Sequence, residues 1–290
     1  MKNYEHLLAE RHHLLNLTDK MRIAEIYKDD VWIENPAALK VIGIIENMMN
    51  ISSTIQAPCL LVEGEGGTGK TSLIRQLQEH PEWKGSMVHI SLAEKPSNLK
   101  FKEQIMAVLG LPSSPMSGRS NSNVEPELAL VIKLRKIRAL CIDELHDSLL
   151  VNRLDQRKNL SLLKKLSGHP YNLIIIGFGV AAARHALKSD PQFERRFYQV
   201  MLPDWGESTT FRSFLAGIEE NLPLKQSSAL YSEELMKFIL SASSGRMDNV
   251  IKLIKSAAAY AITTKLEKIT LELLELAADD PWGYELANVR

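Results

Sequence analysis

The sequence predicts an α/β fold, in which a parallel five-stranded sheet is covered by helices on both faces and is followed by a small all-helical domain. Short apolar runs alternate with helical stretches in the middle of the chain, which is the pattern of strands joined by helical crossovers. After residue 206 the apolar residues recur only at helical spacing. The five predicted strands are Cys59–Glu63, Met87–Ser91, Ala139–Asp143, Asn172–Phe178 and Gln199–Leu202.

Two boundaries divide the chain. Asn35-Pro36 marks the first, because proline suits the first turn of a new helix, and Pro203-Asp204-Trp205-Gly206 marks the second. A segment rich in Ser, Pro, Gly and Asn, residues 111–124, predicts an exposed loop inside the α/β part. We therefore expect four parts: an N-terminal helical extension 1–35, an α/β domain 36–206, a helical domain 207–277 and a C-terminal tail 278–290.

Composition limits the cellular compartments and binding partners that we expect for the protein. The 290 residues carry a formal net charge of zero, so attraction to nucleic acid requires a local patch of cations. The two cysteines, Cys59 and Cys141, lie in apolar runs and are typical of small core residues in a reducing cytosol. The chain starts without an apolar signal region, and no apolar stretch is long enough to span a bilayer. We expect a cytoplasmic protein.

The strongest motif is a complete phosphate-binding loop. Residues 64–71 match G-x-x-x-x-G-K-[ST] and stand between a predicted strand and a predicted helix. The glycines let successive backbone N–H groups point at phosphate oxygens. We expect Lys70 to reach the β- and γ-phosphates of ATP and the Thr71 hydroxyl to bind Mg²⁺. The predicted nucleotide contacts are Gly64, Glu65, Gly66, Gly67, Thr68, Gly69, Lys70, Thr71 and Ser72.

A pair of carboxylates ends the third predicted strand. Asp143 would lie at the edge of the sheet where open α/β folds bind ligands, and we expect it to complete the Mg²⁺ site. Glu144 would act as the general base that activates water. This pair favours hydrolysis over phosphoryl transfer to a metabolite, because a small-molecule kinase does not use an activated water. The alternative is a strand that ends in two solvated acids.

Three arginines are further candidates at the nucleotide. Arg195 and Arg196 precede the last predicted strand, and one of them, Arg196 ahead of Arg195, is expected to reach the γ-phosphate bound by a neighbouring subunit. Otherwise they are surface arginines beside a buried Phe197. Arg246 follows Gly245 between two helices and either folds back on the nucleotide or is an ordinary arginine after a helix cap.

Cations are in excess over acids between residues 95 and 138, including the group Lys133, Arg135, Lys136 and Arg138. No aromatic residues are interleaved with them, so contact with duplex phosphates is favoured over stacking on single strands. The alternative is a solvated helix face. The residues predicted to bind DNA are Lys95, Lys100, Lys102 and Arg119.

Taken together, these stretches resemble the AAA+ ATPases of the TniB/TnsC type, which are related more distantly to MuB. The resemblance covers about residues 20–277. Ile142-Asp143-Glu144-Leu145-His146 is similar to the second nucleotide motif of the family, including its characteristic histidine. The other stretches that carry the resemblance are 22–27 and 32–37, similar to the opening segment beside the adenine, and 172–177, 187–193 and 196–197, similar to the strand, helix and arginine-finger region.

The resemblance implies an AAA+ P-loop NTPase whose C-terminal helical domain is a lid. It also implies ATP and Mg²⁺ as cofactors, slow or rapid ATP hydrolysis, and assembly into rings or helical filaments with six subunits per turn. Such proteins bind duplex target DNA, mark the insertion site and recruit or activate a transposase in the bacterial cytoplasm. They work with a TniQ-type targeting protein and, in CRISPR-associated transposons, with a CRISPR effector.

One position departs from the family pattern. AAA+ proteins place a polar side chain at the end of the fourth strand to position the water, whereas this sequence has Gly177-Phe178-Gly179. Phe178 cannot donate a hydrogen bond, so we expect slow hydrolysis or a substitute such as Asn172 or His146.

Three other functions stay open at this stage. The same fold serves helicase loaders and replication initiators, and it serves signalling ATPase switches that have no DNA role. A nucleotide or metabolite kinase is the third alternative, which Glu144 and the helical domain after residue 206 disfavour.

Overall fold

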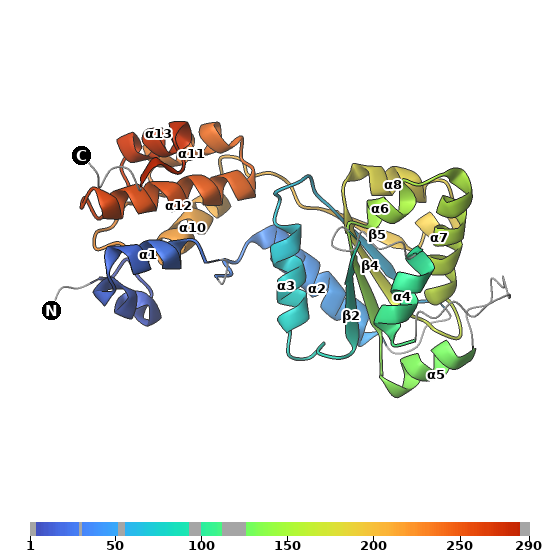
Figure 1. Ribbon diagram of the computed structural model, residues 1–290. Coiled ribbons are helices and arrows are strands. Elements are labelled where there is room, and N and C mark those ends of the chain that lie inside the picture. The colour runs from blue at the N-terminus through green and yellow to red at the C-terminus, as the bar shows by residue number, and fades with distance from the viewer. Residues whose placement is uncertain (1–3, 29–30, 52–55, 93–99, 112–125, 285–290) are drawn as a thin grey trace. The chain divides into compact units, whose positions relative to one another are not determined.

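The computed structural model describes residues 4–28, 31–51, 56–92, 100–111 and 126–284 (Figure 1). Its contacts divide the chain into two compact units. The helical unit combines residues 1–36 and 203–290 with Gly67–Gly69, and the sheet unit comprises residues 37–66 and 70–202. Lys95 and Arg119, two of the residues predicted to bind DNA, lie outside the described residues.

The sheet unit is built on five parallel strands in the order β2-β3-β4-β1-β5, which confirms the predicted fold class. Three strands have their predicted bounds: β1 (Cys59–Glu63), β2 (Met87–Ser91) and β3 (Ala139–Asp143). For the other two strands, each predicted start was wrong by two residues. β4 spans Ile174–Gly179 because Asn172 has a left-handed backbone with φ 47°, and β5 spans Phe197–Met201, with Phe197 paired to Cys59.

Helices cover both faces of this sheet (Figure 1). Two of them, α2 (Pro36–Asn50) and α3 (Lys70–Glu79), lie on one face. The others of the sheet unit are α4 (Phe101–Leu109), α5 (Pro126–Leu134), α6 (Leu145–Leu149), α7 (Arg153–Leu166), α8 (Ala181–Leu187) and α9 (Pro191–Glu194).

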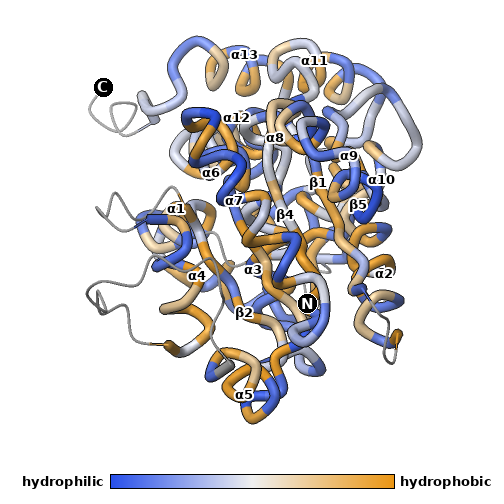
Figure 2. The backbone as a smooth tube through the Cα atoms, turned by 90° about the vertical axis from the view of Figure 1, so that its right-hand side faces the viewer, coloured by the Kyte–Doolittle hydropathy of each residue, from blue (hydrophilic) through white to orange (hydrophobic). Residues whose placement is uncertain are grey.

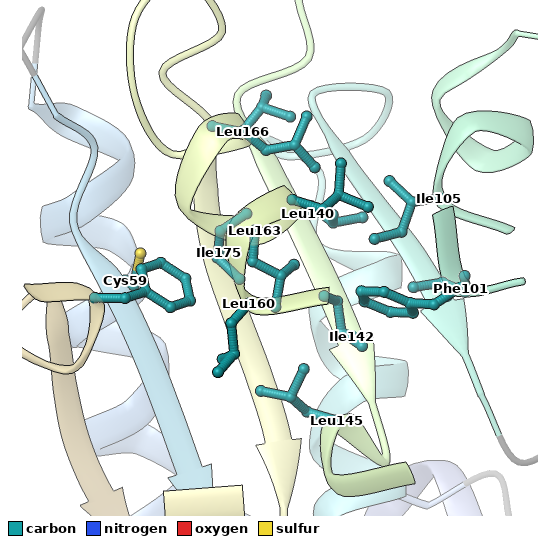
Figure 3. Packing of buried hydrophobic residues seen from close by; sticks show 14 of the residues in the cluster. Cys59, Phe101, Ile105, Leu140, Ile142, Leu145, Leu160, Leu163, Leu166 and Ile175 are labelled. Atoms are coloured by element: carbon teal, nitrogen blue, oxygen red, sulfur yellow. The ribbon is translucent and has the colours of Figure 1, made fainter. Parts of the chain in front are cut away.

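Strands buried on both faces explain the continuous apolar runs of the sequence. Much of β1 and β4 is coloured as hydrophobic in Figure 2, and every residue of β4 is buried. On one face, Cys59 and Ile175 pack with Leu163 of α7 and Ile105 of α4 in a single core cluster (Figure 3). Side chains alternate along a strand, so residues such as Leu60, Val62 and Phe178 face the opposite side.

Parallel strands give the sheet two chemically different edges. The carboxyl edge is where the strands end, at Glu63, Ser91, Asp143 and Gly179, and the amino edge is where they begin. Five residues at about 3.3 Å each separate the two edges by roughly 16 Å. A residue that directly precedes a strand therefore lies far from one that directly follows it.

The helical unit consists of η1 (Ala9–Asn16), α1 (Asp19–Ile26), α10 (Thr209–Glu219), α11 (Glu233–Ser243), α12 (Met247–Thr263) and α13 (Leu271–Asp279). Its four C-terminal helices confirm the helical periodicity predicted after residue 206. The side chain of Arg22 in α1 is fully buried here, where Nη1 donates to Glu267 Oε1 at 2.9 Å and Nε donates to Pro223 O at 3.1 Å. This ion pair joins the N-terminal segment to the C-terminal helices.

A membrane span is not found in the part of the chain that the structure describes, since none of its helices is long and apolar enough to cross a bilayer.

Candidate functional site

The phosphate-binding loop leaves the carboxyl edge directly after β1. The Gly64 N–H donates to Gly179 O at 3.0 Å, which ties the start of the loop to the end of β4. Gly67 and Gly69 have φ angles of 82° and 92°, which other residues rarely adopt, so the motif glycines are needed for the backbone path. Gly66 has open space where a side chain would begin and normal φ, so it is not held to glycine in this way.

Lys70 closes this loop from the first position of α3. Its side chain is buried, and Nζ donates to the carbonyls of Gly64 at 2.6 Å and of Glu65 at 3.0 Å. Thr71 and Ser72 follow in the first turn of α3, and both are exposed. The loop therefore presents a cation, two hydroxyls and the N-terminus of a ten-residue helix at one place, which is the arrangement that binds phosphate.

Asp143 and Glu144 lie at the same carboxyl edge. Asp143 is the last residue of β3, and one strand, β4, lies between β3 and β1. Two strand spacings place Asp143 roughly 10 Å from the end of β1, a gap that phosphates and a metal ion can bridge. Asp143 Oδ1 accepts a hydrogen bond from the N–H of Glu144 at 2.9 Å, and Glu144 turns the chain into α6 with a left-handed φ of 52°.

His146 lies against the carboxylate of Glu144. The distance from His146 Nδ1 to Glu144 Oε2 is 3.0 Å, although the two atoms are not aligned as a hydrogen bond. Gly179 makes room for the ring, because a side chain at that position would begin 3.4 Å from Nδ1. The histidine that the sequence analysis named as part of the second nucleotide motif and as a substitute polar residue therefore contacts the predicted general base.

The end of β4 offers no polar side chain. Phe178 is fully buried, and its neighbour Gly177 faces Leu145 so closely that an added Cβ would lie 2.4 Å from Leu145 Cδ2. Of the two substitutes expected for the polar residue, Asn172 was wrong, because it precedes β4 and lies at the amino edge, about one strand length from the phosphate loop. His146 is at the correct edge.

Sequence reasoning missed a buried ion pair at the start of the loop. Glu63, the last residue of β1, is 4% exposed, and its Oε2 lies 3.4 Å from Nε of Arg184 in α8. Burial raises the pKa of the Glu63 carboxyl, and the nearby cations Arg184, His185 and Lys188 oppose that rise. The available signal was a charged residue ending an apolar strand directly before the first glycine of the motif.

The two candidate finger arginines lie at the amino edge. The N–H of Cys59, at the start of β1, donates to Arg196 O at 2.9 Å. The Arg196 side chain is half-buried, and its Nη1 donates to Lys164 O at 3.1 Å and to Ser167 Oγ at 2.8 Å. Arg195 is exposed, and within the described residues no hydrogen bond or ion pair holds its side chain. Neither arginine lies near the phosphate loop of its own sheet.

Arg246 belongs to the helical unit. It caps the N-terminus of α12, and its Nη2 lies 3.3 Å from Asp204 Oδ2, an ion pair with both side chains about one-third exposed. Gly245 before it has a φ of 69°, and its N–H donates to Leu240 O at 3.1 Å, the geometry of a glycine that ends a helix. A glycine helix cap is therefore present here. Arg246 also lies against the phosphate loop, because a Cβ added at Gly67 would be 3.0 Å from Arg246 Cδ, so its contact with nucleotide stays a prediction.

The basic stretch divides into separate groups. Lys100 and Lys102 are exposed at the start of α4, where the Lys100 N–H donates to Glu103 Oε2 at 3.0 Å. The second group lies at the end of α5 and in the segment that leads into β3, so it is at the amino edge of the sheet: Lys133, Arg135, Lys136 and Arg138. Cations that are close in the sequence thus reach opposite edges of the sheet.

A comparison with protein families identifies the family of this chain. The family described as bacterial TniB protein matches residues 22–207, which include the phosphate loop, Asp143-Glu144 and both finger arginines. This chain belongs to the TniB family. A search of curated protein sequences finds no match to this chain.

Solved structures show which fold this chain shares. The ORC1 protein of Aeropyrum pernix in complex with DNA aligns with a TM-score of 0.64 and 13% identity, over 89% of this chain and 69% of that one. The A. pernix ORC2 protein, in ADPNP and ADP complexes, gives 0.60 and 14%, over 89% and 71%. Cdc6p from Pyrobaculum aerophilum gives 0.60 and 16%, over 85% and 67%. This member of the TniB family therefore has the AAA+ fold and is an AAA+ ATPase.

Proposed function

We propose that this chain is an ATP-dependent, DNA-binding regulator of transposition that assembles on duplex target DNA, marks the insertion site and recruits or activates the transposase. The observation that carries the proposal is the joint placement of the phosphate loop, Asp143 and Glu144 at the carboxyl edge of the sheet. Membership of the TniB family supports transposition, the process that the family resemblance implies, over the alternative roles.

The nucleotide site has the ligands that Mg²⁺ requires. The hydroxyl of Thr71 and the carboxylate of Asp143 are hard oxygen donors, and Mg²⁺ in such sites takes one or two protein ligands with phosphates and waters. Bound Mg²⁺ would neutralise charge on the phosphates while Lys70 holds them.

Glu144 is the group that we assign to the water. Its carboxylate stands at the carboxyl edge, adjacent to Asp143, and the left-handed backbone at residue 144 directs the chain away from the strand. A carboxylate in this place accepts a proton from the attacking water. Phe178 supplies no second polar contact, so slow turnover and long-lived ATP-bound assemblies are part of the proposal.

The finger that completes the site of a neighbouring subunit is assigned to Arg195 in place of Arg196. Both lie at the amino edge, roughly 16 Å from the phosphate loop of their own chain, so either one must act in trans. Arg196 is held by Lys164 O and Ser167 Oγ, whereas Arg195 is exposed. An exposed guanidinium can reach a partner without breaking hydrogen bonds of its own subunit. Assembly into rings or filaments then becomes a requirement for hydrolysis.

Duplex DNA is the partner proposed for Lys100 and Lys102, together with Lys95 and Arg119. Lys100 and Lys102 are exposed beside each other after β2. One structural relative, the ORC1 protein of A. pernix, was solved in complex with DNA. Contacts from lysines to phosphates give affinity without much sequence preference, which suits a protein that must accept many target sites. A TniQ-type targeting protein and, in some systems, a CRISPR effector would then select the site.

The test is assembly on DNA. Wild-type protein with ATP and duplex DNA should form rings or filaments in electron micrographs, and Lys70→Ala should form none. Adding the cognate transposase should give co-assembly only with the ATP-bound form. Assembly that ignores both ATP and DNA would contradict the proposal and favour a signalling switch. Binding confined to a replication origin would favour an initiator, a role for which the likeness to ORC and Cdc6 proteins shows only a common fold.

A further inference from the structure

A groove of about 620 Å³ opens at the amino edge of the sheet unit, on the side away from the phosphate loop. Most of its lining is apolar, and its exposed large apolar residues are Ile51, 45% accessible, and Leu130, 57% accessible. Leu130 belongs to α5, whose tube is largely hydrophobic in colour in Figure 2.

Three cations line the same groove. They are Lys133, Lys136 and Arg138, and no Asp or Glu is among the lining residues. Arg138 donates from Nη2 to Ile51 O at 2.8 Å, which fixes it over the apolar floor. Lys133 and Lys136 are exposed, and neither forms an ion pair with another described residue. The groove therefore combines exposed apolar side chains with positive charge that no acid of its own lining balances.

A surface of the complementary kind exists on the helical unit. Along α13, Glu275, Leu276 and Asp279 are exposed at helical spacing, and Leu276 is 41% accessible. Trp282, which follows the helix, is 66% accessible. Glu275 and Asp279 form no ion pair with other described residues. We call these four residues the acidic face of α13.

We propose that the acidic face of α13 in one copy of this chain docks into the amino-edge groove of a second copy. Glu275 and Asp279 would face Lys133 and Lys136, and Leu276 would contact Leu130. Exposed apolar residues between charges of opposite sign are what a helix-in-groove contact uses. The inference rests on the proposed function, because it supplies a contact for the assembly that trans completion by Arg195 requires.

The symmetry of this contact has a direct consequence. The groove and the acidic face are different surfaces, so each copy would use one to bind the copy before it and the other to bind the copy after it. Such heterologous contacts generate closed rings or open helical filaments, not two-fold dimers. DNA is a less suitable occupant of the groove, because phosphates would leave its exposed Ile51 and Leu130 without a partner.

Charge exchange tests the contact. Lys133→Glu/Lys136→Glu and Glu275→Lys/Asp279→Lys should each weaken self-association about tenfold or more by placing like charges together. A mixture of the two variants should recover association, measured by sedimentation velocity with ATP and duplex DNA. Lys252→Glu, an exposed change elsewhere on the helical unit, is the control. Normal association of either variant, or no recovery in the mixture of folded variants, would overturn the proposal.

Disulfide trapping separates this inference from the proposed function. Cys59 and Cys141 are both buried, so Leu130→Cys and Leu276→Cys would introduce the reactive thiols. Mild oxidation of the two differently tagged proteins, with or without nucleotide and DNA, should give a mixed dimer. Leu154 on α7 is similarly exposed, so Leu154→Cys is the control, and it should form little mixed dimer with Leu276→Cys.

The outcomes are distinct. A mixed dimer without ATP-dependent assembly on DNA would support the contact and contradict the proposed function. Assembly on DNA without the mixed dimer would support the proposed function and contradict the contact. A weaker, less salt-dependent affinity of Lys133→Glu/Lys136→Glu for DNA with unchanged self-association would assign the groove to nucleic acid and overturn the inference.

Discussion

Glu144 Oε2 lies 3.0 Å from Nδ1 of His146, two residues later in the chain. The contact hides one carboxylate oxygen from solvent, while the Glu144 side chain as a whole is 30% exposed. Since β4 ends in Phe178 and glycines, the described polar side chain that contacts this carboxylate is the imidazole. The position of the proposed general base therefore depends on His146 more than on any group of the neighbouring strand.

Glu144→Gln should keep ATP binding and abolish turnover, because the amide cannot accept a proton from water. Assemblies on DNA should then persist after ATP is depleted. Steady-state phosphate release and the lifetime of filaments measure the two effects. Turnover equal to that of the wild type would remove Glu144 from its assigned role.

His146→Ala should lower kcat about tenfold and leave the affinity for ATP unchanged, since the contact orients the base and touches no proposed phosphate ligand. His146→Gln, which keeps a hydrogen-bonding group at this place, should recover part of the loss. A change confined to KM would contradict a positioning role.

Arg195→Ala and Arg196→Ala should fail in different ways. Arg195→Ala should abolish most hydrolysis and leave thermal stability unchanged, since its side chain is exposed. Arg196→Ala removes the donor to Lys164 O and Ser167 Oγ and should cost about 1–3 kcal/mol of unfolding free energy. Mixing Arg195→Ala with Lys70→Ala subunits should restore some turnover if the finger acts in trans. The reverse pattern of stability and activity would return the role to Arg196.

Lys100→Glu/Lys102→Glu should weaken DNA binding and make it less sensitive to salt. If each lysine neutralises one phosphate, the slope of log affinity against log salt should fall in magnitude by about 2. Lys252→Glu, also exposed, is the matched control. An unchanged slope would place the DNA on another surface.

Acid should weaken the helical unit through Glu267. Burial would raise the pKa of this carboxyl, but hydrogen bonds from Arg22 and Lys225 outweigh burial and lower it to about 2. Because the folded pKa lies below the unfolded value near 4.3, the stabilisation is complete above that value and is lost as the pH falls towards 2. Glu267→Gln should remove this dependence, and Arg22→Ala should cost about 3–5 kcal/mol at neutral pH. Denaturant titrations across that pH range measure both.

Several parts of the fold were readable from the sequence for a physical reason. Strands buried on both faces must be continuous apolar runs, which is why β1, β2 and β3 were predicted to the residue. The start of β4 was not, because an apolar run does not reveal that Asn172 has a left-handed backbone. The phosphate loop and Asp143-Glu144 are local motifs, and they could be found without knowledge of the tertiary structure.

Pairings between distant residues could not be found in this way. Glu63 and Arg184 are 121 positions apart, and no local pattern predicts that they meet. The choice between Arg195 and Arg196 depends on which side chain Lys164 and Ser167 hold, which is a property of packing. The basic stretch is likewise continuous in the sequence, but in the structure its second half, at the end of α5 and before β3, lies at the amino edge of the sheet.

The separation of the phosphate loop and Arg195 by the length of the strands affects the terminal subunits of an assembly. The phosphate loop lies at one edge of the sheet and Arg195 at the other. Under the proposed trans completion by Arg195, every nucleotide in a filament needs a following neighbour, and one terminal subunit has none. ATP at that end should outlive ATP in the interior. A growing filament would then carry a persistent ATP-bound tip, which gives it a direction and a marked last position on the DNA.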